Sequence, residues 1–364
     1  PLSLGSAFSS NGTADNGYRS ARFQQFLGAL DRYQARLQQR YVGTTYPAGL
    51  GTWSGQSYDP ENGVVGKYSS EVMIPAFLDT YTSMGGTTDI FPILTKLLPN
   101  WTLTYSGLAS LPAFKRWFRA FNLNHSYRSL YNVGSYNSFQ SYRSAVDGLG
   151  FISNVENGRP QPSSQFDIST VSINESFSPL LGVDATFYNS MTAKLEMRRT
   201  RVLTLSMASQ LLTETHSNDI VVGIGYRVND FKFPTFGGSG VKGKSSKSRR
   251  SARSASANNS NNDSFSDSAS GTSGDGFAHS LNLRLDLSFR DQSALQRNLL
   301  TTLSQATSGN RAVQISFSAD YAVSRFFTIS AYYERQMNRP LLTSSAFPTT
   351  VQDFGLNLKF QLAR

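Results

Sequence analysis

The sequence predicts an all-β protein, an antiparallel transmembrane β-barrel, on three observations. Five segments in its C-terminal half alternate apolar and polar residues with a period of two, which is the period of a β-strand. No apolar run is long enough to form a membrane-spanning helix. Charged residues make up 16% of the chain, against about a quarter in soluble domains, and this balance suits a wall with an apolar outside and an uncharged polar inside.

The clearest alternating segment runs from residue 280 to 291. One strand face would carry its apolar residues and the other its polar residues. The apolar residues are Leu281, Leu283, Leu285, Leu287 and Phe289. The alternation recurs over 220–228, 313–321, 327–333 and 354–362. A soluble antiparallel sandwich also alternates, but aromatic residues lie toward the segment ends, where membrane interfaces favour them.

Twelve strands are predicted, all after residue 99. We expect short links at Asn189-Ser190, Thr200-Arg201 and Val323-Ser324 to form hairpins. The predicted strands cover residues 100–107, 118–133, 136–146, 166–175, 181–188, 192–198, 202–209, 219–230, 279–290, 312–322, 325–336 and 352–363.

Residues 1–98 do not alternate and are predicted to be a mixed helix and loop region before the barrel strands of 99–364. Residues 19–41 place apolar side chains at helical spacing, which predicts an amphipathic helix packed on a folded cap or plug, or lying on a membrane surface. A second short helix is expected over 70–84, with Pro75 near its start.

Residues 236–276 are nearly all small, polar or basic and are predicted to form a disordered loop. The loop carries a large share of the net charge of +10. A solvated loop between two strands is the simpler interpretation, and binding of anionic lipid, lipopolysaccharide or nucleic acid is the alternative. No aromatic residues interleave the basic ones, which disfavours a nucleic-acid partner.

The sequence indicates no enzyme, metal site or cofactor. The chain has no cysteine, which excludes disulfides and thiol chemistry. Ser126 follows His125 directly, so on a strand their side chains point to opposite faces and cannot form a nucleophile and base pair. His216 and His279 are expected at loop or strand ends, with no second ligand at metal spacing.

Eight segments, in this order and spacing, resemble the C-terminal region of the SprA/Sov family. These proteins are the outer-membrane translocons of the type IX secretion system, which is linked to gliding motility. Together the similarity covers roughly residues 60–364, and the basic loop departs from the family pattern. The segments are residues 72–81 (VMIPAFLDTY), 98–108, 112–136, 172–184, 212–234 (LTETHSNDIVVGIGYRVNDFKFP), 279–291, 308–324 and 344–362.

The resemblance implies a function in protein transport across the bacterial outer membrane. This chain would form the closing part of a very large barrel, through which folded cargo passes from the periplasm to the cell surface. The implied partners are the N-terminal remainder of the barrel, a smaller PorV-like barrel that collects cargo, a periplasmic plug protein, a peptidyl-prolyl isomerase-like accessory protein, cargo with a C-terminal type IX signal domain, and outer-membrane lipid. A chain that starts at Pro1 with no export signal fits a fragment of a longer precursor.

Two sets of site residues follow from these expectations. The last strand resembles a barrel-assembly signal at Asp353, Gly355, Leu358 and Phe360. Because they alternate with apolar residues, a second set of polar residues is predicted to face the lumen. This set is Arg284, Asp286, Arg290, Asp320, Glu334 and Lys359.

Two other functions fit the alternation. A self-contained barrel of about twelve strands would act as a porin or receptor. A soluble β-sandwich adhesin would need no membrane. If the C-terminus is periplasmic, strand parity places the loops at 291–310 and 337–351 outside and the loop at 236–276 inside.

Overall fold

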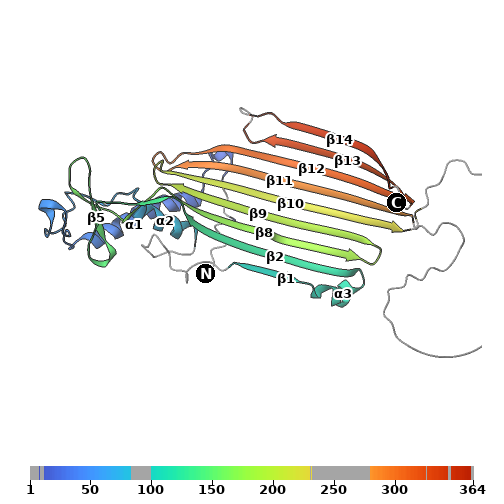
Figure 1. Ribbon diagram of the computed structural model, residues 1–364, viewed down its shortest axis with the longest axis horizontal. Helices are drawn as coiled ribbons and strands as arrows, with labels where there is room; N and C mark the ends of the chain where they lie inside the picture. Colours follow the sequence, from blue (N-terminus) through green and yellow to red (C-terminus); the bar gives the residue numbers. More distant parts are fainter. Residues whose placement is uncertain are drawn as a thin grey trace, which may run out of the picture.

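The computed structural model describes residues 8, 12–82, 100–229, 231, 279–324, 326–342 and 346–361. The predicted basic loop at 236–276 lies outside the described residues. The described chain consists of a long antiparallel sheet with a smaller helical body at one end (Figure 1). Within the described residues, no helix is long and apolar enough to cross a membrane.

Among the described residues, nine strands form the large sheet, and every neighbouring pair is antiparallel. The sheet is open over the described residues, with β1 and β14 at its edges, so the antiparallel β architecture is confirmed and closure into a barrel is not seen. The strands, in sheet order, are β1 (Trp101–Tyr105), β2 (Phe118–Val133), β8 (Thr170–Phe187), β9 (Met191–Ser206), β10 (Leu211–Asn229), β11 (Ser280–Asn298), β12 (Ser304–Ser324), β13 (Phe327–Pro340) and β14 (Thr349–Phe360).

Two predicted strand breaks are wrong because each interrupted strand continues. β8 spans the predicted gap between residues 175 and 181, where a register irregularity follows Phe177 and Pro179 cannot donate a ladder hydrogen bond. β9 runs through the predicted hairpin at Thr200-Arg201. Arginine at an apolar-face position of β9 interrupts the hydrophobic pattern, and the structure satisfies it with a buried carboxylate instead of a turn.

The strands are also longer than predicted at one end. β11 reaches Asn298 and β12 begins at Ser304, so most of the predicted external loop at 291–310 is strand. The hairpin at Asn189-Ser190 is confirmed, and Ser190 adopts the positive φ that tight hairpins require.

The segment between β2 and β8 leaves the large sheet. The predicted wall strand at 136–146 is therefore wrong, and only short strands occur there. These are β3 (Tyr136–Ser138), β4 (Arg143–Ser144), β5 (Gly150–Ser153), β6 (Pro160–Pro162) and β7 (Phe166–Ile168), in two small sheets.

The predicted helices are confirmed as α1 (Ala21–Tyr41) and α2 (Ser70–Tyr81), with a short α3 (Pro112–Lys115) before β2. Ser20 caps α1 by accepting a hydrogen bond from the Phe23 amide. α2 is apolar on nearly all sides and almost fully buried, as expected for a helix packed between two layers. Pro75 is the sixth residue of α2, which is deeper in the helix than predicted.

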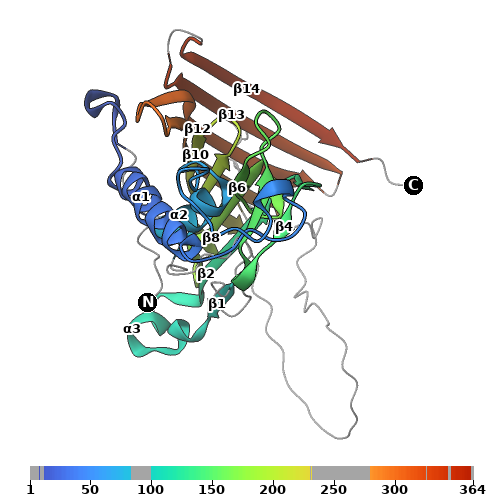
Figure 2. The ribbon, with the colours of Figure 1, turned by 90° about the vertical axis from the view of Figure 1, so that its left-hand side faces the viewer.

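We use the name helical subdomain for residues 12–82 together with residues 134–169. Its core joins α1 and α2 to the short strands, where Tyr41, Tyr46, Tyr58 and Phe151 pack edge to face. The core continues into one end of the large sheet, at residues of β8, β9 and β10 (Figures 1 and 2). Apolar burial thus attaches the helices to the sheet.

Candidate functional site

One face of the large sheet is polar from β8 to β14, and we call it the polar face. The register assigns every second residue of each strand to it. Short hydroxyl and amide side chains alternate there with charges of both signs. The charged residues on β8 to β12 are Asp184, Lys194, Glu196, Arg198, Asp219, Arg227, Arg284, Asp286, Arg290 and Asp320.

The polar face is hollowed where β8 to β12 lie side by side. The hollow has a volume of about 910 Å³, and Asp184, Lys194, Arg284 and Asp320 are among its lining residues. Gly223 leaves room for the Asp286 side chain in the floor of the hollow, because a Cβ at residue 223 would lie 2.9 Å from an Asp286 carboxylate oxygen.

Opposite charges on the polar face pair along the sheet. Arg284 Nε lies 2.6 Å from Asp286, and Arg290 Nε lies 2.9 Å from Asp219 across two strands. These exposed pairs contribute little to stability, ~1 kcal/mol or less each. They do leave a hydrophilic surface without a strong net charge.

The register places all six predicted lumen residues on the polar face. Arg284, Asp286 and Asp320 border the hollow. Glu334 accepts a hydrogen bond from Gln314 Nε2 at 2.7 Å, and Lys359 lies opposite Thr328 on the edge strand. Their role in lining a pore stays a prediction.

The other face of the sheet, which we call the apolar face, has two parts. The larger part is an exposed apolar band, in which apolar side chains lie opposite one another in successive rows across β9 to β12 and continue onto β13 and β14. Polar residues interrupt the band on the last two strands, at Arg335, Thr350 and Gln352. On β11 the band runs from Leu281 to Phe289, roughly 27 Å along the strand at about 3.4 Å per residue, close to the height of membrane barrel walls. Phe289 is 45% exposed and Leu356 is 63% exposed. The described chain covers neither fully.

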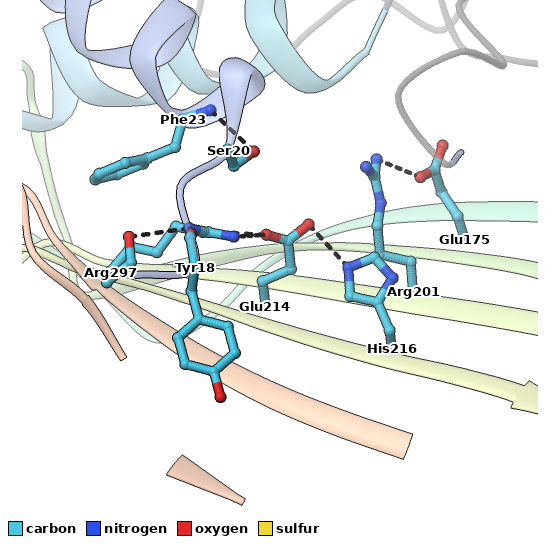
Figure 3. A network of polar contacts seen from close by, with 9 residues as sticks. Tyr18, Ser20, Phe23, Glu175, Arg201, Glu214, His216 and Arg297 are labelled. Atoms are coloured by element: carbon cyan, nitrogen blue, oxygen red, sulfur yellow. Dashed lines mark hydrogen bonds and ion pairs between the residues drawn. The ribbon is translucent and has the colours of Figure 1, made fainter. Parts of the chain in front are cut away.

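The smaller part of the apolar face lies under the helical subdomain and contains a buried ionic layer (Figure 3). Arg201 on β9 binds Glu175 on β8 at 2.6 Å, and both side chains are almost fully buried. Tyr127 on β2 donates a further hydrogen bond to Glu175. Glu214 on β10 binds His216 at 2.9 Å and Arg297 of β11 at 3.2 Å.

Arg297 connects the ionic layer to the helical subdomain. It donates hydrogen bonds to the Tyr18 carbonyl at 2.6 Å and to Ser304 Oγ at 2.9 Å. Its guanidinium lies 5.6 Å from the centre of the Phe23 ring in α1 (Figure 3). Arg201 similarly lies over the ring of Tyr81 in α2. Buried charges need such partners, so the layer fixes where the helices dock.

Burial also shifts acidities inside the helical subdomain. Desolvation raises the pKa of Glu71, near the start of α2, to about 7, and the charge of Arg40 offsets part of that shift. Desolvation likewise raises the pKa of Tyr41, whose hydroxyl donates to the Gly150 carbonyl at 2.9 Å. These groups lie far in sequence from the polar face and are structural.

The candidate assembly signal lies on β14, an edge strand whose side chains are almost all exposed. Leu358 and Phe360 point to the apolar face, and Phe360 stacks on Phe327 with ring centres 4.5 Å apart. Asp353 and Gly355 lie on the polar face, where Gly355 sits against the Tyr332 ring. Recognition by assembly machinery stays a prediction.

Each of the three histidines packs against or bonds to neighbouring residues, and His279, just before β11, stacks on the Tyr321 ring. His125 Nδ1 lies 2.6 Å from the Leu180 carbonyl, and its ring packs near Trp101 and Phe177. His216 lies inside β10 and is buried, so its predicted place at a strand end is wrong. Among the described residues, no three acidic or histidine side chains gather as a metal site.

Sequence reasoning missed the ionic layer. Arg201, Glu214 and Arg297 all occupy positions that continue the apolar face of their strands. The sequence did contain a sign of this layer. A charged residue at a strand position where the alternation expects an apolar one is buried, and a buried charge needs a partner. The structure also makes Glu334 and Asp353, from the two predicted sets, direct register partners on β13 and β14.

Comparison with known proteins gives no family for this chain. No model of a known protein family matches it. No curated protein matches it either.

Proposed function

We propose that this chain forms part of the wall of a large outer-membrane β-barrel that conducts proteins, as its resemblance to the SprA/Sov family implies. The observation that carries the proposal is a sheet with one apolar face, one polar face and two open edges. An exposed apolar band of membrane height fits lipid, and the polar face fits an aqueous lumen.

The number of strands supports a contribution from further strands. In an antiparallel sheet of nine strands, β1 and β14 run in the same direction, so direct closure would require a parallel pair. Bacterial single-chain barrels are closed by antiparallel pairs and have even strand numbers. An open edge in lipid would also leave backbone groups unsatisfied, each at a cost of several kcal/mol. We therefore infer that strands outside the described residues pair with β1 and β14.

The polar face suits a surface along which a polypeptide passes without a bond being made or broken. Its charges are balanced and largely paired, so it would bind a passing polypeptide weakly and select little by sequence. On this proposal the protein is not an enzyme, and its partners are the rest of the barrel, a PorV-like barrel, a periplasmic plug, a peptidyl-prolyl isomerase-like protein, cargo and lipid.

A periplasmic C-terminus would give the proposed wall an orientation. β14 ends at Phe360, on the same end of the sheet as Asn229 and Ser280, which flank the basic loop. The helical subdomain lies at the opposite end (Figure 1). With a periplasmic C-terminus, the helical subdomain is extracellular and packs on the outer side of the wall, not inside the lumen.

The first test is the intact mass of the polypeptide that carries residues 346–361, purified from outer membranes in mild detergent, with native electrophoresis beside it. Continuity with a much longer chain, or tight association with one, is the expected result. A stable species of 40.0 kDa whose mobility changes on heating would instead indicate a self-contained porin or receptor. Recovery without detergent would indicate a soluble adhesin.

A second test uses the absence of cysteine. Cysteines introduced at Thr102 in β1 and at Asn357 in β14, singly and together, and labelled with a photo-activated crosslinker, report which strands lie beside each edge. Crosslinks to a segment outside the described strands are expected. A crosslink between the two introduced cysteines would mean that the sheet closes on itself and would contradict the proposal.

A further inference from the structure

One row of residues separates the apolar band from the part of the apolar face beneath the helices, and we call it the boundary row. Register partners run directly across six strands: Phe177, Arg199, Asn218, Asp291, Arg311 and Arg339. The next row toward the band is apolar on β9 to β13, with Met197, Ile220, Phe289, Val313 and Met337. On β9, β11 and β12 the change from charged to apolar side chains therefore occurs within a single step of two residues.

The boundary row carries more positive than negative charge. Arg311 binds Asp291 at 3.0 Å, and both side chains are well exposed. Arg339 lies directly opposite Arg311 on the next strand. Like charges at opposed positions repel each other unless an anion lies between them. Asp291 neutralises only one of the arginines.

Arg199 is prepared for an anion in a different way. Its guanidinium stacks on the Phe8 ring, with 4.8 Å between the guanidinium carbon and the ring centre. A guanidinium over an aromatic ring keeps its positive charge and its N–H donors. Within the described part of the chain, the buried Nε of Arg199 has no hydrogen-bond partner, and the same holds for Nε of Arg335, which lies two rows into the band.

We propose that the boundary row binds the phosphate groups of a membrane glycolipid whose acyl chains lie along the apolar band. Arginine edges match phosphate oxygens in a bidentate manner, and strand neighbours about 4.8 Å apart can share one phosphate. The lipid would place its charged headgroup at the row and its chains on Phe289, Val313 and the rows below. This inference rests on the proposed membrane wall, and it names a lipid partner for the outer side of that wall.

The orientation of the wall selects the class of lipid. With a periplasmic C-terminus the boundary row lies at the extracellular side, at the level of the outer leaflet. Phosphorylated glycolipids are the anionic lipids of that leaflet in a Gram-negative outer membrane. On β9 the row lies next to Arg201, whose guanidinium lies over the Tyr81 ring of α2, so the headgroup would lie beside the helical subdomain.

The test compares two triple variants of the full-length protein in detergent. The boundary variant is Arg199→Gln, Arg311→Gln and Arg339→Gln. The control is Arg198→Gln, Arg227→Gln and Arg290→Gln, which removes the same charge from the polar face of the same sheet. Each protein is incubated with diphosphoryl lipid A or with phosphatidylcholine, washed, and analysed by native mass spectrometry.

We expect the wild type and the control to retain lipid A, and the boundary variant to retain at least tenfold less. Equal retention by all three proteins overturns the inference, as does displacement of lipid A by millimolar inorganic phosphate or by an acidic peptide, which would indicate a site for a free anion or for protein. If the boundary variant does not fold, an Arg→Lys triple replaces it, and full retention of lipid A by lysine would overturn bidentate recognition.

Flotation of the wild-type protein with phosphatidylcholine vesicles separates this inference from the proposed function. Protein that does not float is not a membrane wall, and the proposed function fails. Protein that floats while the boundary variant retains lipid A normally leaves the proposed function intact, and only the lipid site fails.

Discussion

The two parts of the apolar face have the same alternating sequence pattern, but the helical subdomain covers one part and leaves the apolar band exposed. β9 passes through both: Leu203 is fully buried beneath α1 and α2, whereas Leu195, four register rows away on the same face, lies in the uncovered band. Between them the strand carries Arg199 and Arg201. A period of two therefore identifies which side chains avoid water and does not identify what they contact. On β9 these two arginines lie where the covered part of the apolar face ends and the exposed band begins.

The largest difference between the covered and the exposed part is expected when a charge is removed from the ionic layer. Arg297→Met leaves Glu214 buried with less compensation and removes the link to Tyr18. We expect a loss of about 3–5 kcal/mol in the free energy of unfolding of the helical subdomain. Protease resistance of residues 12–82, followed against urea, measures it.

The matched control is Arg311→Met, which breaks an exposed pair on the same face and should cost ~1 kcal/mol or less. Equal losses in the two variants would show that the helices do not cover the ionic layer in solution.

The second comparison keeps the strand, the face and the residue type. Leu203→Ala opens a cavity under the helices and should cost about 2–5 kcal/mol. Leu195→Ala should cost ~1 kcal/mol or less, because Leu195 is only partly buried and its loss leaves no enclosed cavity. Thermal unfolding in detergent measures both. A large cost at Leu195 would reveal protein, not lipid, against the apolar band.

The third prediction concerns pH and the helical subdomain alone. A carboxyl whose pKa is raised in the folded state weakens the fold as pH rises, beginning above its ordinary value of 4.5 and complete above about 7. Wild-type protein should therefore lose on the order of 1–3 kcal/mol between these values through Glu71.

Glu71→Gln should remove that loss. The melting temperatures of wild type and variant should agree near pH 4 and separate by pH 8, with the variant higher. Exposed Glu61→Gln serves as the control. A parallel pH dependence in all three proteins would contradict a buried, poorly compensated Glu71 carboxyl.

The smallest effect is expected at the edge of the uncovered part. In Gly355→Ala, the new Cβ would lie 2.5 Å from Tyr332 Cε1, so the ring must move. The ring is exposed at its edge, and we expect a cost of ~1 kcal/mol together with slower assembly of the last strand. The double variant Gly355→Ala with Tyr332→Ser should recover stability. Failure to recover would assign the effect to the glycine itself.

Much of the fold was predictable because it depends on local periodicity. The strands β2 and β10 to β14, the helices α1 and α2, and the hairpin at Asn189-Ser190 each follow from side-chain spacing within one segment. The polar set from Arg284 to Lys359 shares one face for the same reason. The ionic layer was not predictable in this way, because Glu175, Arg201, Glu214 and Arg297 come from four strands.

The sequence by itself determined most of the long strands, the two main helices and the sorting of strand side chains to two faces, since alternation and helical spacing are properties of neighbouring residues. Only the tertiary structure decided which part of the apolar face is covered, that β9 continues through Arg201, and that residues 134–169 join the helices. The reason is physical: whether a charge such as Arg201 marks a turn or a buried ion pair depends on a partner 26 residues away, and only folding brings that partner within 2.6 Å.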